Sequence, residues 1–281
     1  MTDRVQSQPI HRDDGWEGPS AAPGSEARGS IRMASMIAGV GLLVMSALAA
    51  FGKVVVLDGL VTSGDAAQTA EDLTASDGLF RLSILSLFLV IALDVVVAWA
   101  LYRVFSPVSR SIALLAAWMR IVFAAVFLAA VGHLAGALRL LTGEEYRSVF
   151  GADELQAQAL LQINTFSDVW GAGLFLFGLH LLLLGYLAYR SGYVPKLLGV
   201  LLAIAGLGYV VDSFAAVLYG ESWTDVSNFT FLGEFLLALW LVIFGRRLPV
   251  DRPRRRDEGS RSADSHGMTG PDDRSTTERP S

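Results

Sequence analysis

The stretch Leu79–Arg103, LFRLSILSLFLVIALDVVVAWALYR, decides the fold of this chain. It is predominantly apolar over more than the roughly 20 residues that an α-helix needs to cross a bilayer. One aspartate, Asp94, lies inside it. A carboxylate at that depth costs free energy unless a partner compensates its charge. The stretch therefore predicts a membrane-spanning helix and indicates that Asp94 has a partner on another helix.

The composition of the whole chain points to the same class of protein. Of its 281 residues, 53% are hydrophobic and 17% are charged, whereas about a quarter of the residues in a soluble domain are charged. The formal net charge of -5 argues against a nucleic-acid partner. Cysteine is absent, which excludes disulfides and thiolate metal sites. We expect an integral membrane protein whose main partner is the lipid bilayer.

Six stretches are long and apolar enough to be read as spans, although the sixth is short. The first follows a polar segment too long for a secretory signal, and its apolar run continues beyond the A-x-A-like residues 47–49, so we expect it to be retained. The sequence thus predicts an all-α, polytopic transmembrane helical bundle of six spans in one domain, residues 31–248. The expected spans are about 34–57, 79–102, 112–138, 163–189, 197–218 and 229–244.

The two ends of the chain differ from this domain in composition. Residues 1–30 and 249–281 are polar and rich in Ser, Gly, Pro and charge, so they bury too little apolar surface to offset the entropy of ordering. We expect both to be disordered cytoplasmic tails. The basic run RPRRR at 252–256 is interpreted as a topology anchor, with binding of anionic lipid as the alternative.

The placement of basic residues predicts the orientation. Loops rich in Lys and Arg stay in the cytoplasm, and Arg103 with Arg110, like Arg190 with Lys196, flank every second connection. Both tails are also rich in arginine. We therefore expect both termini inside, which requires an even number of spans. Arginine far outnumbers lysine, as in GC-rich bacterial genomes, so we expect the plasma membrane of a bacterium.

The longer loops on the other side contain two helical patterns. Residues 63–78 and 151–162 are predicted to form short amphipathic helices on the outer surface, and we interpret both as connectors, with a substrate lid as the alternative. Thr62 or Ser63 is expected to cap the first, and Gly151 to begin the second.

Four ionisable residues of the spans fall at a similar depth. At about 1.5 Å per helical residue, Asp94 and Arg120 lie roughly 14 Å from the nearest inner basic residue, His180 about 15 Å and Glu234 about 18 Å. Because a short turn joins their helices, Asp94 and Arg120 are expected to form an ion pair. The four form a candidate polar core. One interpretation is that they only fix helix packing; the other is a functional polar site.

A second polar layer is predicted nearer the outer side of the bilayer. Arg81, His133 and Asp168 lie about 33 Å from the inner basic residues by the same measure, and Asp212 about 24 Å. The spacing between Arg81 and Asp94 equals that between Arg120 and His133. A hairpin that aligns the inner pair therefore also brings Arg81 level with His133.

Motifs of the common enzyme classes do not occur in the sequence. It has no H-E-x-x-H, G-x-S-x-G, Walker-type glycine loop or dinucleotide-binding turn. His133 and His180 lie at different depths, so a shared metal site is not expected. An intramembrane aspartyl protease needs two carboxylates that share a proton, and the glycine-flanked aspartate motif expected of that family is missing around Asp212. The sequence therefore favours a protein that is not an enzyme, and we expect no cofactor and no metal.

Several longer segments resemble a known family. GYVPKLLGVLLAIAGLGYVVDSF at 192–214, with residues 64–86, 93–122 and 233–245, is similar to domain-of-unknown-function family 4386, a group of bacterial integral membrane proteins. The resemblance covers most of residues 31–245. It implies a multi-helix membrane domain without an established activity, and therefore no catalytic residues.

Three functional classes remain open. A small-solute or proton-coupled transport component would use Asp94, Arg120, His180 and Glu234 as its polar pathway. A scaffold or sensory protein would use the same residues only for packing. An intramembrane enzyme is disfavoured, since no nucleophile or metal constellation is present. The sequence specifies neither a small-molecule substrate nor whether the chain forms a homo-oligomer.

Overall fold

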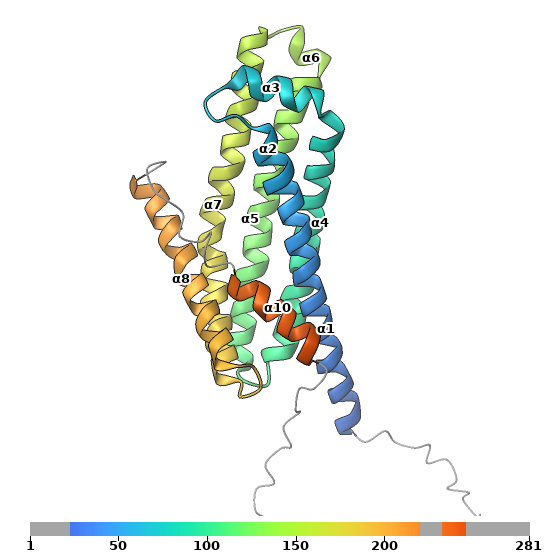
Figure 1. Cartoon of the computed structure of the whole chain (residues 1–281), viewed down its shortest axis with the longest axis vertical. Coiled ribbons are helices and arrows are strands. Elements are labelled where there is room, and N and C mark those ends of the chain that lie inside the picture. The colour runs from blue at the N-terminus through green and yellow to red at the C-terminus, as the bar shows by residue number, and fades with distance from the viewer. Residues whose placement is uncertain (1–22, 220–231, 246–281) are drawn as a thin grey trace, which may run out of the picture. The chain divides into compact units, whose positions relative to one another are not determined.

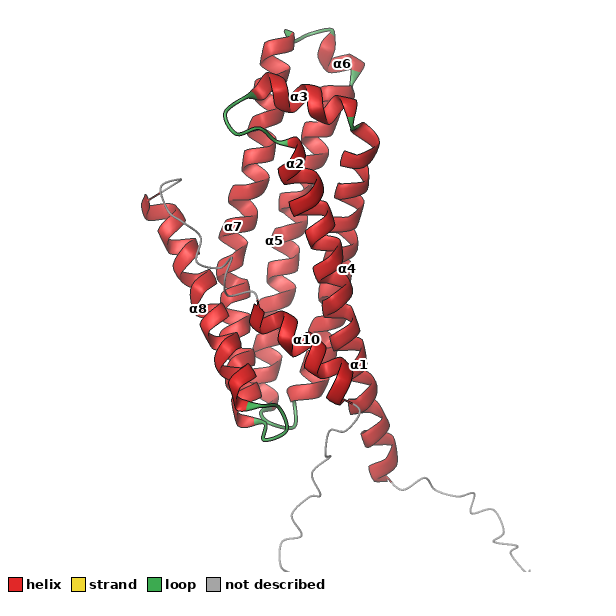
Figure 2. Cartoon of the chain, viewed as in Figure 1, coloured by secondary structure: helices red, strands yellow, loops and turns green. Residues whose placement is uncertain are grey.

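The computed structural model describes residues 23–219 and 232–245, all within one compact unit that comprises residues 1–248. Every regular element in these two ranges is a helix (Figure 2), which confirms the all-α fold. The second unit, residues 249–281, lies outside the described residues and includes the basic run at 252–256.

In the described part of the chain, five helical segments are long and apolar enough to cross a membrane, and a sixth is apolar but shorter. Three short helices occupy the described connections. The long segments are α1 (Pro23–Ala49) with its continuation η1 (Ala50–Leu57), α4 (Asp77–Phe105), α5 (Arg110–Thr142), α7 (Ala152–Arg190) and α8 (Lys196–Tyr219); the shorter apolar helix is α10 (Leu232–Phe244), and the connecting helices are α2 (Asp58–Leu60), α3 (Ala66–Ala75) and α6 (Glu144–Arg147).

Two helical hairpins make up most of the bundle. A short turn joins α4 to α5, and a second joins α7 to α8, where Gly192 has the positive φ of 73° that favours glycine. α5 packs on both α4 and α7, so it is the helix of the first hairpin that contacts the second (Figure 1). α1 packs along α4, and α10 contacts both α1 and α8.

A tyrosine links the two hairpins at their turns. The hydroxyl of Tyr193, between α7 and α8, donates to the carbonyl of Val104 on α4 at 2.7 Å. Its ring stacks on Phe105, with centroids 6.3 Å apart. Burial raises the pKa of Tyr193 above its usual value, because the neutral phenol loses less on leaving water than the phenolate does.

α1 begins earlier than the sequence analysis expects. Its first residue is Pro23, so residues 23–30 of the expected disordered tail are helical. Proline suits the first turn of a helix because its fixed φ matches the helix and its missing N–H has no partner there anyway. The rest of that tail, residues 1–22, lies outside the described part of the chain.

α1 widens into a π-helix, η1, over Ala50–Leu57. There Gly52 lies directly against α4, and Ser83 Oγ donates to the Gly52 carbonyl at 2.9 Å. A Cβ at Gly52 would overlap Ser86 Oγ, so the close approach requires glycine. π-Helical turns are rare and carry no pattern that hydropathy reveals.

The segment at residues 151–162 is not a separate surface helix. It is the first part of α7, a continuous helix of 39 residues. Gly151 precedes it, as expected. No glycine or proline follows within residues 152–170, so nothing in the sequence ends the helix after residue 162. At 1.5 Å per residue, α7 is about 58 Å long, whereas the apolar core of a bilayer is about 30 Å thick. Its first turns therefore extend beyond the apolar core.

The other expected connector helix is present. α3 spans Ala66–Ala75, but its N-cap is Asp65, whose carboxylate accepts from the Gln68 amide at 2.9 Å. The expected cap residue Thr62 instead bonds through its backbone to Thr69 Oγ1. Asp65 takes the role because it directly precedes the first helical residue.

α10 has 13 residues, which is about 20 Å of helix. This is shorter than the roughly 30 Å of a bilayer core, and residues 229–231 of the expected sixth span lie outside the described part. The span count of six therefore stays a prediction. A Cβ at Gly245, just after α10, would lie 2.7 Å from Ser35 Cβ of α1. The end of α10 thus lies beside α1.

Candidate functional site

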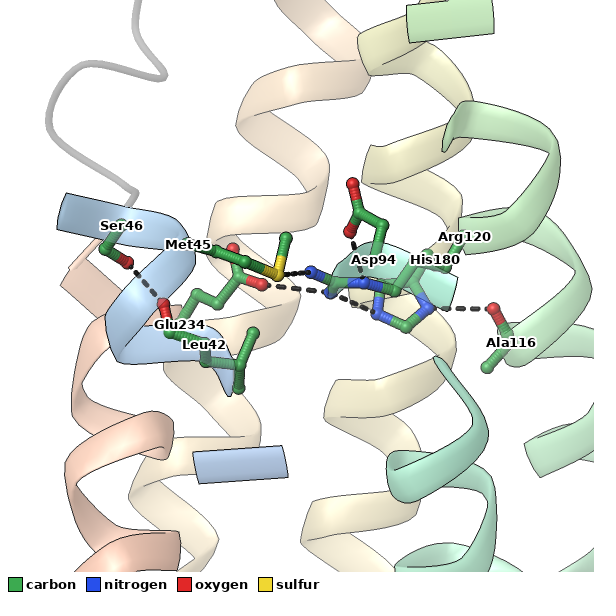
Figure 3. Close-up of polar contacts among 8 residues, drawn as sticks. All are labelled: Leu42, Met45, Ser46, Asp94, Ala116, Arg120, His180 and Glu234. Carbon is green, nitrogen blue, oxygen red and sulfur yellow. Dashed lines mark hydrogen bonds and ion pairs between the residues drawn. The ribbon is translucent and has the colours of Figure 1, made fainter. Parts of the chain in front are cut away.

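Arg120 on α5 lies at the centre of the described bundle. Only 1% of its side chain is exposed, and its Nε donates to Asp94 Oδ1 on α4 at 2.8 Å. Asp94 is also 1% exposed. The two residues face each other because the short α4–α5 turn places them at the same level of an antiparallel pair (Figure 3).

A second carboxylate reaches the same guanidinium from a helix far along the chain. Arg120 Nη1 donates to Glu234 Oε1 of α10 at 3.0 Å. Glu234 is 21% exposed, so it lies nearer the edge of the cluster than Asp94. α10 begins only two residues before it, and therefore a helix N-terminus also contributes positive potential at this carboxylate.

The imidazole of His180 on α7 completes the cluster in a defined tautomer. Its Nδ1 lies 2.8 Å from the carbonyl of Ala116, which only accepts, so Nδ1 carries the hydrogen. Nε2 then accepts from Arg120 Nη1 at 3.3 Å. A proton on Nε2 would oppose the Arg120 donor and break this contact.

Two apolar side chains complete the surroundings of Arg120. Met45 Sδ of α1 lies 4.0 Å from Nη2, and the Phe177 ring of α7 lies 5.3 Å from the guanidinium carbon. The second contact has the geometry of a cation–π interaction. Arg120 thus touches α1, α4, α7 and α10 in addition to its own helix.

A cavity of about 160 Å³ adjoins the cluster. Asp94, Arg120 and Glu234 line it together with five aromatic residues. Asp94 Oδ2 is buried and has no hydrogen-bond partner among the described residues. Figure 3 shows this oxygen on the side of the carboxylate away from Arg120. The aromatic lining residues are Phe123, Phe127, Trp170, Phe177 and Tyr209.

The outer polar residues have different surroundings. Arg81 pairs with Asp77 of its own helix at 2.9 Å and is half exposed. His133 Nδ1 lies 2.7 Å from Gln162 Oε1 of α7. Asp168 is exposed, and Asp212 is buried on α8. The structure thus gathers the four inner residues into one cluster, whereas Arg81 and His133 have separate partners.

Some residues around Arg120 were not expected from the sequence. Phe177 lies three positions before His180, which places it on the same face of α7, so helical spacing alone would have found it. Met45 and Tyr209 carry no such signal, because their helices meet the cluster only through the tertiary packing. Gln162, the partner of His133, was missed because the segment containing it was read as a surface helix.

The described residues contain no group of three or more His, Cys, Asp or Glu that could hold a metal ion. His180, the one histidine in the cluster, already uses both ring nitrogens, one on a carbonyl and one on Arg120. What the cluster offers a ligand is therefore carboxylate oxygen, above all Asp94 Oδ2.

Comparison with known proteins identifies similarity to proteins whose function is not established. An uncharacterized protein from Archaeoglobus fulgidus is 38% identical over 166 residues, which make up 59% of this chain and 85% of the relative. No solved structure matches the chain. Because this relative is archaeal, the similarity extends beyond the bacteria that the sequence analysis named. The family model described as "Domain of unknown function (DUF4386)" matches residues 37–245, a range that contains the whole cluster. The chain therefore belongs to the DUF4386 family.

Proposed function

We propose that the chain is a membrane transport component that binds a small solute or a proton at Asp94, Arg120, His180 and Glu234. One observation carries the proposal: a buried carboxylate oxygen without a described partner, Asp94 Oδ2, in a residue that lines a cavity of about 160 Å³. An ion pair that serves packing alone has no need of such a space.

The burial of Asp94 supports the binding of a ligand or a proton at this residue. Nearly all buried polar atoms in proteins have a hydrogen-bond partner, because an unpaired one costs the full price of its desolvation. Arg120 satisfies Oδ1, while Oδ2 has no hydrogen-bond partner among the described residues. A ligand or a proton that reaches the cavity would bind where this cost is relieved.

A second candidate function is a membrane scaffold or sensor in which the charges only hold the helices together. The observation that favours it is the position of Arg120, which contacts four other helices. Buried ionic groups fix arrangement in some proteins. In that case the cavity has no access to water in the membrane.

Cellular placement is part of the same proposal. We place the domain in the plasma membrane, with six spans and both termini in the cytoplasm. The basic residues near the α4–α5 and α7–α8 turns support this orientation, as does the close approach of Gly245, just after α10, to Ser35 of α1.

Cysteine labelling on this cysteine-free chain tests the function. Ser46 lines the cavity, so Ser46→Cys should react with a small, water-soluble, charged thiol reagent when the protein is in membranes. Ser83→Cys is the matched control, because Ser83 is fully buried between α4 and η1. Equal, negligible reactivity of both variants would contradict a transport route and favour the scaffold.

A further inference from the structure

The charges of the described residues around the cavity do not balance. Among the described lining residues, Asp94 on α4 and Glu234 on α10 are acidic and Arg120 on α5 is basic. Lys53, which lies over the lining ring of Trp170, is paired with Asp58. Tyr209 on α8 also lines it, and His180 on α7 lies behind Arg120. The residues that α1 contributes to the lining carry no charge. Two carboxylates therefore face one guanidinium.

One guanidinium compensates only one of these negative charges. Arg120 gives Nε to Asp94 and Nη1 to Glu234, so each carboxylate has one of its oxygens on the same cation. An uncompensated charge costs several kcal/mol in a poorly hydrated interior. A second positive charge, either a proton or a bound cation, would remove that cost.

The aromatic walls favour a cation over a neutral or anionic ligand. Aromatic faces carry negative potential and attract cations within about 6 Å. Two of the lining rings already hold positive groups: Phe177 lies 5.3 Å from the Arg120 guanidinium carbon, and Trp170 lies 5.7 Å from Lys53 Nζ. Phe123, Phe127 and Tyr209 offer further ring surface.

Size and hydrogen bonding narrow the class of cation. A cavity of about 150 Å³ accommodates benzene, so this cavity of about 160 Å³ suits a compound of similar size. Asp94 Oδ2 requires a donor. An ammonium group with N–H supplies both the charge and the donor, whereas a quaternary ammonium supplies only the charge.

We propose that the cavity binds a small monovalent organic ammonium ion, whose N–H donates to Asp94 Oδ2 and whose charge compensates the second carboxylate. This inference rests on the proposed function and names its cargo. The ammonium ion and a proton compete for the same negative charge. As the cation enters, a carboxyl O–H gives its proton to water, so the total charge of the site does not change.

Titration calorimetry on the purified full-length protein tests this inference with n-butylammonium chloride as the probe. Butyrate and 1-butanol are the anionic and neutral controls of similar size, and sodium chloride controls for ionic strength. We expect saturable binding of n-butylammonium alone. Its observed heat should differ between phosphate and MOPS buffers at one pH, because protons released on binding are taken up by buffers with different ionisation enthalpies; Tris is avoided because its protonated form is itself a small organic ammonium ion.

Variants connect the binding to the site. Asp94→Asn removes the charge and should weaken n-butylammonium binding at least about tenfold, as loss of a charge-assisted hydrogen bond implies. Glu234→Gln should also weaken it, and serves if Asp94→Asn does not fold. Asp168→Asn, at an exposed acid of α7, should bind like the wild type.

The outcomes separate the two proposals. Absence of n-butylammonium binding, equal binding of 1-butanol or butyrate, or undiminished binding by folded Asp94→Asn and Glu234→Gln overturns the ammonium inference. If Ser46→Cys is reactive while n-butylammonium fails to bind, the transport site stands and only its cargo is wrong. If Ser46→Cys is as unreactive as Ser83→Cys, the proposed function itself falls.

Discussion

Arg120 is the residue on which the buried polar contacts converge. Its guanidinium presents five N–H donors in a rigid plane, and the described contacts use Nε and Nη1 to reach two carboxylates and an imidazole. A lysine has three donors on a single atom and could not span these acceptors from one position. The side chain therefore holds both acids in place, while the second oxygen of Asp94, a residue that lines the cavity, has no partner among the described residues.

Removal of this cation should be strongly destabilising. Arg120→Met leaves Asp94 and Glu234 without their partner, and breaking a buried ion pair in this way costs about 3–5 kcal/mol. Thermal unfolding in detergent measures the effect. Arg81→Met is the matched control, since Arg81 pairs only at an exposed position and its loss should change stability by no more than about 0.5 kcal/mol. Equal losses in the two variants would mean that the buried contacts contribute little.

The four members of the cluster could be found from the sequence because the rise of a helix is constant. Counting residues from the inner basic positions gives depth, and Asp94, Arg120, His180 and Glu234 share one level. The depth of a residue along its helix does not show which neighbour its side chain contacts. Arg81 and His133 also share a level, yet Arg81 turns to Asp77 one helical turn away. The cavity could not be predicted, because it depends on side chains from helices far apart in the chain.

At the scale of elements, glycines let α7 and α8 approach closely. A Cβ at Gly178 would lie 2.7 Å from the Gly206 carbonyl, and one at Gly185 would lie 2.7 Å from the Gly199 carbonyl. Gly171, which continues the seven-residue spacing, would meet no described atom within 4 Å. The seven-residue spacing of Gly171, Gly178 and Gly185 therefore does not give three equivalent close approaches. At Gly171 the contact with α8 is made by the carbonyl, which accepts from Ser213 Oγ at 3.2 Å, while the position of a Cβ is open.

Replacing glycine by alanine should therefore change the stability of the protein in opposite directions at Gly171 and Gly178. Gly171→Ala adds a methyl group in open space and should stabilise α7 by about 0.5–1 kcal/mol through helix propensity. Gly178→Ala pushes the same methyl group against backbone and should destabilise by about 1–3 kcal/mol. Unfolding midpoints of the two variants in detergent decide the matter. A stabilising Gly178→Ala would show that the helices separate without cost.

The hydrogen bond from Tyr193 to Val104, which links the two hairpins, predicts that the stability of the protein depends on pH. The pKa of Tyr193 is raised in the folded state. Its contribution to the free energy of unfolding is therefore fully present below the usual tyrosine pKa near 10 and is lost as the pH rises above that value. Tyr193→Phe should lose about 1 kcal/mol at neutral pH, from the bond to Val104. It should also show a weaker fall in unfolding temperature between pH 9 and 11. The control is Tyr189→Phe, at a half-exposed tyrosine, which should keep the wild-type pH profile.

Helix type was predictable from hydropathy, but helix length was not. The first part of α7 is amphipathic and its later part apolar, which suggested two helices where the chain has one. Without a glycine or proline between them, the backbone hydrogen bonds simply continue. η1 is the opposite case: one apolar run hides a change of helix type that tertiary packing of Gly52 on α4 favours.

For the whole molecule, the remaining question is which end of the bundle faces the cytoplasm. The turns that carry Arg103, Arg110, Arg190 and Lys196 lie at one end, and the connection that contains α6 lies at the other (Figure 1). The first end has the basic excess that retains loops inside the cell. α10 ends beside α1 at this basic end, because Gly245 approaches Ser35.

Single cysteines in intact cells test this orientation and the number of spans together. Ser148→Cys, exposed after α6, should react with a membrane-impermeant maleimide, whereas Ser109→Cys in the α4–α5 turn should react only after permeabilisation. The reverse pattern would place the basic end outside. Ser281→Cys reports on the last helix: an even number of spans requires it to behave like Met33→Cys, which lies in α1 just before the expected first span, and like Ser109→Cys. If it behaves like Ser148→Cys instead, the segment that contains α10 does not complete a sixth crossing, and Glu234 reaches Arg120 from a helix that enters the bilayer without traversing it.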